Sequence, residues 1–246
     1  MLLVSQAPTL VVLTIVVAVR RTPLQPGPWI VAGLLAGLVG LGGLAALYRG
    51  MAIGVVSVVA AIAATAPIVP ILVGLALGER PSVVQFAGML LALGGIGLLA
   101  FDRRRPAASG RLVPGVGLAL VAALAFGFFL VAIRYASRPD ALYGVVAVRA
   151  GSVFALVVLA LVFRSRLRVA AADLPALFVV GTLDVGADIL FAFATTIGLL
   201  SIVSILSSLY PVVTILLARI VRKERMARLQ QTGIALAFAG VVLISR

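Results

Sequence analysis

Two carboxylates, Asp184 and Asp188, lie in the middle of the apolar segment 174–198, far from either of its ends. An ionisable group at the centre of a bilayer costs about 3 kcal/mol even on lenient scales, so such groups usually face a cavity and have a function. The i, i+4 spacing places both side chains on one face of a helix. Two adjacent carboxylates repel each other in a medium of low dielectric constant, which favours a proton on one of them. The pair therefore indicates a site for proton coupling or for a substrate amine.

A basic residue, Arg149, lies inside another apolar segment, 142–163. Its guanidinium could bind a substrate carboxylate, balance the charge of Asp184, or extend toward the nearer interface. The structural alternative for the carboxylates is an ion pair with Arg149 that anchors two helices. Together with Tyr210, Arg149 and the two aspartates are the candidates for binding substrate or coupling protons.

A polar stripe precedes Pro211 in the segment 200–221. Ser201, Ser204 and Ser208 share one face of a helix at spacings of three and four residues. Their hydroxyls could line a cavity. The alternative, which we favour for the serines, is contact between helices, where each hydrogen-bonded pair contributes about 0.6 kcal/mol.

Other residues shape the helices. Pro67 and Pro211 lie inside long apolar segments, where they are expected to kink the helix and to free backbone carbonyls. Gly33 and Gly37 form a small-xxx-small motif that favours close helix packing. Glu79 ends a segment beside an arginine, and we interpret it as an interfacial cap or salt-bridge partner, not as a catalytic acid.

The composition explains why so few polar residues stand out. Of the 246 residues, 63% are hydrophobic and 11% are charged, whereas a soluble domain has about 45–50% and about 25%. These values exclude a soluble enzyme, a DNA-binding domain and a disordered chain. The net charge of +13 comes from short basic clusters between apolar runs, as expected beside lipid head groups. Because Cys and His are absent, we predict no catalytic residue, no metal and no cofactor.

A bundle of membrane helices must position these residues. A bilayer core of about 30 Å needs about 20 helical residues. Nine apolar runs of suitable length are present, at 1–19, 27–47, 52–77, 82–101, 113–134, 142–163, 174–198, 200–221 and 227–245. We therefore predict an all-α, polytopic membrane protein of about nine transmembrane helices. The basic residues of alternate loops give conflicting orientations, so the side of the termini stays open.

The two halves of the chain repeat each other. Residues 53–72 match 197–216 at an offset of 144 (197 − 53), and residues 79–98 match 224–243 at an offset of 145 (224 − 79). We predict a first repeat at 1–101, a linker at 102–112 and a second repeat at 113–246. The second repeat contains five helices, and an odd number places the two copies in opposite orientations across the bilayer. The first repeat shows four.

Short motifs within these repeats resemble the EamA domain of the drug/metabolite transporter superfamily. In the second half they are SSLYPVVT at 207–214 and KER at 223–225, and in the first half YRGMAIGVVS at 48–57 and GER at 78–80. The resemblance covers nearly the whole chain. It implies ten helices in two five-helix inverted repeats around a cavity, moving small metabolites. This chain departs from that pattern by lacking the usual first helix, which indicates either a start assigned too late or a truncation.

The leading hypothesis is a secondary transporter (permease or exporter) of small metabolites, such as amino acids or drug-like compounds, that works by alternating access. The alternative is a transport-inactive membrane fragment that acts as a packing or assembly partner. An intramembrane enzyme is disfavoured because only Ser, Asp and Arg would remain for its chemistry. The expected partners are a small-molecule metabolite, the lipid bilayer and protons, with no nucleic acid, and a homodimer stays open. We expect a multi-pass location in a bacterial inner or plasma membrane.

Overall fold

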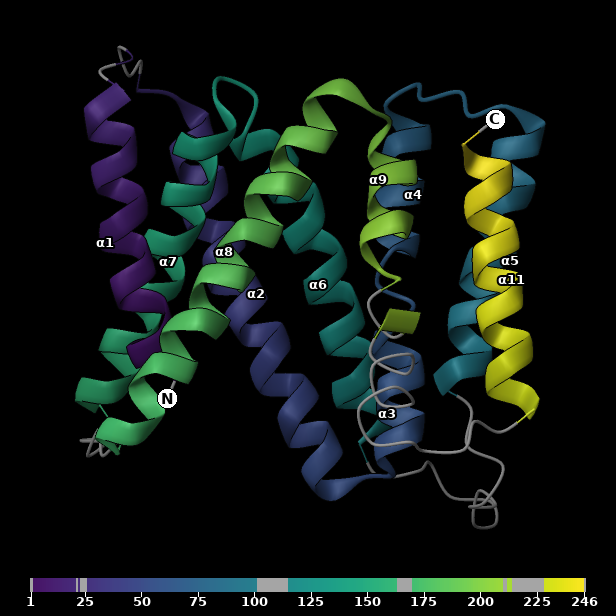
Figure 1. The fold of residues 1–246 in the computed structure, drawn as a ribbon, viewed down its shortest axis with the longest axis horizontal. Helices are drawn as coiled ribbons and strands as arrows, with labels where there is room; N and C mark the ends of the chain where they lie inside the picture. Colours follow the sequence, from purple (N-terminus) through teal and green to yellow (C-terminus); the bar gives the residue numbers. More distant parts are fainter. Residues whose placement is uncertain are drawn as a thin grey trace. The chain divides into compact units, whose positions relative to one another are not determined.

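Every regular element in the described part of the chain is a helix (Figure 1). The computed structural model describes residues 2–20, 22, 26–100, 115–162, 170–209, 212–213 and 228–245. The elements in chain order are α1 (Leu2–Arg20), α2 (Pro28–Ile53), α3 (Val56–Ala63), α4 (Ile68–Ala76), α5 (Val83–Ala100), α6 (Val116–Ala136), α7 (Ala141–Val162), the 3-10 turn η1 (Ala171–Asp173), α8 (Leu174–Ile197), α9 (Leu200–Ser207) and α11 (Arg228–Ile244). Within these residues the expected all-α fold is confirmed.

Several of these helices have the length and composition of membrane spans. Among the described residues, five helices are long and apolar enough to do so, namely α1, α2, α6, α7 and α8. Shorter apolar stretches occupy α5 and α11. Large aliphatic side chains on these helices are exposed, as Leu183 and Leu190 of α8 illustrate at 69% and 72% exposure, which is typical of helices that face lipid. The chain is a multi-pass membrane protein.

The segment predicted at 52–77 is a broken helix. Helix α3 ends at Ala63, a turn follows, and α4 begins at Ile68 with Pro67 as its N-cap residue. Proline has no N–H to donate and its ring clashes with the preceding turn, which favours a break in the helix at this position. The hydroxyl of Thr65 donates to the carbonyl of Ile62 (2.6 Å) inside the turn. The chain is thus broken between α3 and α4, next to Pro67, whereas Pro211 lies outside the described residues.

The chain folds as two compact units. One consists of residues 1–41 and 128–197, and the other of residues 42–127 and 198–246. The first unit, called here the α1–α8 unit, holds α1, α7 and α8 with parts of α2 and α6. The second, called the α5–α11 unit, holds α3, α4, α5, α9 and α11 with the remaining parts of α2 and α6. Each is described by itself below.

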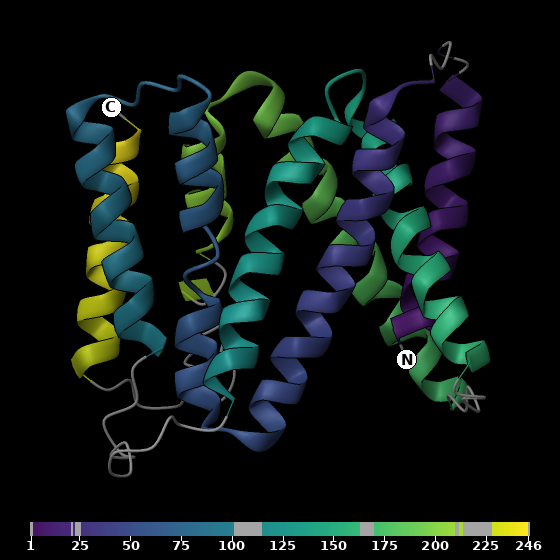
Figure 2. The ribbon, with the colours of Figure 1, turned by 180° about the vertical axis from the view of Figure 1, so that it is seen from behind.

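In the α5–α11 unit, α5 and α11 lie side by side and antiparallel (Figures 1 and 2). A Cβ atom added to Gly88 would lie 2.7 Å from the carbonyl oxygen of Gly240, and one added to Gly95 would lie 2.6 Å from that of Gly233. The repeat aligns Gly88 with Gly233 and Gly95 with Gly240, so exchanging the two repeats exchanges these two contacts. The packing thus has the local two-fold symmetry of an inverted repeat.

The consecutive residues Gly94 and Gly95 offer a test of this helix pair. We expect Gly95→Ala to destabilise the protein by about 1–3 kcal/mol, because the new Cβ meets the backbone of α11. Gly94→Ala meets nothing within 4 Å among the described residues, so it should leave stability equal or raise it by up to about 1 kcal/mol. Thermal unfolding of the detergent-purified protein measures both. Equal melting temperatures for the two variants would contradict the packing.

In the α1–α8 unit, glycines bring α2 and α7 into backbone contact. A Cβ atom on Gly37 would collide with the carbonyl oxygen of Val148 and the N–H of Ser152, and one on Gly151 would collide with the backbone of Leu34. The hydroxyl of Ser152 donates across the crossing to the carbonyl of Gly37 (3.2 Å). In a bilayer the hydrophobic effect does not hold helices together, because lipid tails are as apolar as the helices. Close packing at small residues stabilises the crossing instead. The predicted close packing by Gly37 is confirmed, and α7 is its partner.

Candidate functional site

Asp140 fixes the beginning of α7. Its Oδ1 accepts hydrogen bonds from the backbone N–H groups of Leu142 (2.8 Å) and Tyr143 (3.2 Å), which otherwise have no partner inside the helix. Its Oδ2 lies 3.3 Å from Nη1 of Arg20 at the end of α1. With a rise of 1.5 Å per residue, Arg149 lies about 13 Å further along α7 than this cap. The cap therefore sets Arg149 well inside the span.

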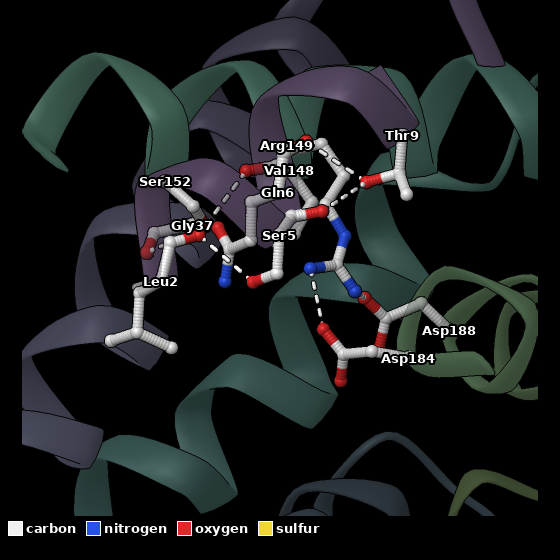
Figure 3. Close-up of polar contacts among 10 residues, drawn as sticks. All are labelled: Leu2, Ser5, Gln6, Thr9, Gly37, Val148, Arg149, Ser152, Asp184 and Asp188. Atoms are coloured by element: carbon white, nitrogen blue, oxygen red, sulfur yellow. Dashed lines mark hydrogen bonds and ion pairs between the residues drawn. The ribbon is translucent and has the colours of Figure 1, made fainter. Parts of the chain in front are cut away.

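Arg149 joins α7 to both aspartates of α8 (Figure 3). Its Nη1 lies 2.6 Å from Oδ2 of Asp184, and its Nη2 donates to Oδ2 of Asp188 at 2.6 Å. The i, i+4 spacing of the aspartates lets one planar guanidinium reach both carboxylates at once. We call these three residues the Arg149 triad.

The members of the Arg149 triad differ in their exposure. The side chain of Arg149 is 4% exposed and that of Asp188 is 15% exposed, whereas that of Asp184 is 55% exposed. The Nε of Arg149 is buried and has no hydrogen-bond partner among the described residues. Each carboxylate uses one oxygen, Oδ2, for the guanidinium. Asp184 is thus the member of the triad that another molecule can contact.

Helix α1 lines the same region with uncharged polar groups (Figure 3). Ser5 and Thr9 are buried on one face of α1, and a Cβ added to Gly181 of α8 would collide with the backbone carbonyl of Ser5. The hydroxyl of Ser5 donates to Leu2 (3.0 Å) and that of Thr9 to Gln6 (2.9 Å), so both satisfy carbonyls of their own helix. The charges of the triad therefore meet no further charge from this stretch of α1.

The structure shows which groups Arg149 is paired with. The sequence leaves open a substrate carboxylate, Asp184 and the nearer interface as its partner. Arg149 is paired with Asp184, and also with Asp188. It is buried, so it does not extend to the interface. Within the described part of the chain, no group of three His, Cys, Asp or Glu side chains could hold a metal ion.

The other predicted site residues belong to the α5–α11 unit or lie outside the described residues. Tyr210 and Pro211 lie outside the described residues. Ser201 and Ser204 are fully buried in α9, in the α5–α11 unit. The hydroxyl of Ser208 donates to the carbonyl of Ser204 (2.7 Å), while the hydroxyl of Ser204 is buried without a partner among the described residues. These contacts favour helix packing over cavity lining for Ser201 and Ser208.

Glu79 has a partner that the sequence does not indicate. Its carboxylate accepts hydrogen bonds from the backbone N–H groups of Leu200 (2.6 Å) and Ser201 (3.1 Å) and from the hydroxyl of Ser201 (2.8 Å). It therefore caps the positive N-terminal end of α9. Glu79 follows α4 of the first repeat and α9 belongs to the second, so this cap links the two repeats within the α5–α11 unit. The sequence-based interpretation as a cap is right, but the helix it caps is distant in sequence.

Removal of this cap should cost stability. We expect Glu79→Ala to lower the free energy of unfolding by about 2 kcal/mol, because two backbone donors and a hydroxyl lose a charged acceptor. Ser201→Ala removes only the hydroxyl contact and should cost about 1 kcal/mol. Thermal unfolding of both variants in detergent measures the difference. A Glu79→Ala protein as stable as wild type would show that the cap contributes nothing.

Comparisons with known proteins identify the fold. A model of the EamA-like transporter family matches residues 1–101 and 113–246. No curated protein sequence matches the chain. A solved crystal structure of another protein aligns with a TM-score of 0.78 over 99% of this chain and 88% of that chain, at 21% sequence identity. At that identity, the likeness shows a shared fold.

Proposed function

Since the chain belongs to the EamA-like transporter family, we propose that it is a secondary transporter of small metabolites that works by alternating access. The candidate cargo is an amino acid or a drug-like compound. In this proposal the Arg149 triad is the site where substrate binds or a proton couples to transport.

The observation that carries the proposal is the position of the triad. Three ionisable side chains lie inside helices that are otherwise apolar, at α7 and α8. Ion pairs at such a depth are costly, and hydrophobic residues would hold two helices together at lower cost. The aligned positions in the first repeat are Gly40 and Leu44, so the pair of aspartates is not a requirement of the repeat fold.

The inverted repeat supports alternating access. Two halves of opposite orientation can adopt two exchanged arrangements of similar energy, one open to each side of the membrane. The broken helix at Pro67 is a point where the backbone can bend during such a rearrangement. The Glu79 cap joins the two repeats and can oppose it. Conversion between the two arrangements needs no nucleotide, and its energy would come from a gradient.

The test is transport by the purified full chain in proteoliposomes. A panel of labelled amino acids, organic cations and organic anions would be offered with and without a proton gradient. We expect saturable uptake of at least one compound, accelerated when the same unlabelled compound is inside the vesicles. A folded, reconstituted protein that gives only the leak of empty vesicles for the whole panel would contradict the proposed function.

A further inference from the structure

The Arg149 triad carries unequal charges. Arg149 contributes one positive charge, and Asp184 and Asp188 contribute two negative charges when both are ionised. One negative charge is therefore left over inside the membrane, where an unbalanced charge is strongly unfavourable. We propose that this site binds a small organic cation of single charge, such as a quaternary or protonated amine, in exchange for one proton. This inference rests on the proposed function and names its substrate class.

The guanidinium cannot serve as the substrate-binding group. Nη1 and Nη2 of Arg149 are both paired at 2.6 Å, and the side chain is 4% exposed. A substrate carboxylate would have to displace an aspartate and would then add a further negative charge to a site that already has one too many. The site thus discriminates against anions, and its Arg149 orients the carboxylates instead of binding cargo.

Asp184 is the group that meets the cation. It is 55% exposed, and its Oδ2 is taken by Arg149, so Oδ1 is the acceptor it presents. Asp188 lies one helical turn further along and is mostly buried behind the guanidinium, with an exposure of 15%. A cation beside Asp184 would complete an alternating row of two positive and two negative charges, which balances the site.

Among the described residues of the α1–α8 unit, no other charge lies beside the triad. The groups of α1 that face α8 are the uncharged Ser5 and Thr9, and α7 supplies Arg149 itself. The remaining described charges of the α1–α8 unit lie at or beyond helix ends, and they are Arg20, Arg134, Arg138, Asp140 and Asp173. The excess charge is therefore removed either by a proton or by the bound cation. One proton leaves a carboxylate for the solvent as one cation binds, so the exchange is electroneutral.

Binding in detergent tests this inference without requiring transport. The purified full chain in weak buffer would be titrated with benzyltrimethylammonium, a fixed cation that carries no exchangeable proton. A pH-indicator dye would report protons released, and equilibrium dialysis would report binding. We expect about one proton to be released per bound cation. The apparent Kd for the cation should rise about tenfold for each unit by which the pH is lowered, over the pH range in which the unoccupied site carries the proton. Phenylalanine and benzenesulfonate are the zwitterionic and anionic probes of similar size.

Two variants separate the triad from general effects. Asp184→Asn leaves Arg149 and Asp188 as a balanced pair, so we expect cation binding to weaken by about 100-fold and proton release to vanish. Asp173→Asn, a carboxylate outside the triad, should bind as wild type does. Binding of the cation without proton release, equal binding of the sulfonate, or no binding of the cation would overturn the inference. Cation binding without transport in vesicles would instead contradict the proposed function and leave this inference standing.

Discussion

Asp184→Asn together with Asp188→Asn is expected to destabilise the protein by about 3–5 kcal/mol, the largest stability loss that we predict. The reason is that Arg149 remains buried, with a side chain 4% exposed, after both of its carboxylate partners are gone. A guanidinium cannot lose its proton to become neutral, whereas a carboxylate can gain one. Arg149→Met alone should therefore cost less than the double substitution. Thermal unfolding and the yield of monodisperse protein in detergent measure both.

Two further variants make this prediction specific. Adding Arg149→Met to the double variant removes the last charge, and we expect stability to return to within about 1 kcal/mol of wild type. Asp140→Asn is the matched control, because Asp140 also pairs with an arginine but at a distance of 3.3 Å and at the end of a helix. Exposed ion pairs contribute little to stability, and asparagine also caps helices. The Asp140→Asn substitution should therefore lower the free energy of unfolding by less than about 1 kcal/mol. A double variant as stable as this control would contradict the buried ion pair.

Asp184→Asn alone is expected to abolish transport while leaving the fold intact. The substitution keeps the shape of the side chain and leaves the buried pair of Arg149 and Asp188, at 2.6 Å, in balance. Stability should stay within about 1 kcal/mol of wild type. The excess negative charge is gone, so neither a proton nor a cation is drawn to the site, and the initial rate of uptake should fall at least about 100-fold.

The comparison for this variant is Asp173→Asn, assayed in the same vesicles at equal amounts of reconstituted protein. Asp173 lies in η1, before the beginning of α8. We expect its rate to stay within about twofold of wild type, since an exposed carboxylate in high dielectric has little influence on a distant site. Uptake by the Asp184→Asn protein at the rate of the Asp173→Asn protein would show that Asp184 has no role in transport.

The helices and their breaks can be predicted from the sequence because local features determine them. Apolar runs of about 20 residues indicate spans, and a proline inside such a run, as at Pro67, favours a break because it removes a backbone donor. The inverted repeat is visible as matched glycines, among them Gly88 with Gly233 and Gly95 with Gly240. The contact between the two helices that carry them comes from the structure. The i, i+4 spacing of Asp184 and Asp188 likewise places them on one face of a helix, since the helical period alone decides this.

The partners across helices cannot be predicted in the same way. The sequence suggests Asp184 as a partner of Arg149, but the second partner, Asp188, depends on how α7 crosses α8. Glu79 caps a helix that begins 121 residues later in the chain, so no local pattern indicates Leu200 as its partner. The exposure of a side chain also cannot be predicted from the sequence. The proposed roles of Asp184 and Asp188 nevertheless differ because their side chains are 55% and 15% exposed.

The most direct test of the central claim compares wild type with the triple variant of Arg149→Met, Asp184→Asn and Asp188→Asn in one transport assay. Both proteins would be reconstituted at equal density after their melting temperatures had been shown to agree. Uptake of a labelled compound identified with the wild type would be measured against an excess of the same unlabelled compound inside the vesicles. We predict saturable exchange by the wild type and only the leak of empty vesicles by the folded triple variant. Equal exchange by both proteins would show that the triad anchors α7 to α8 and has no part in transport.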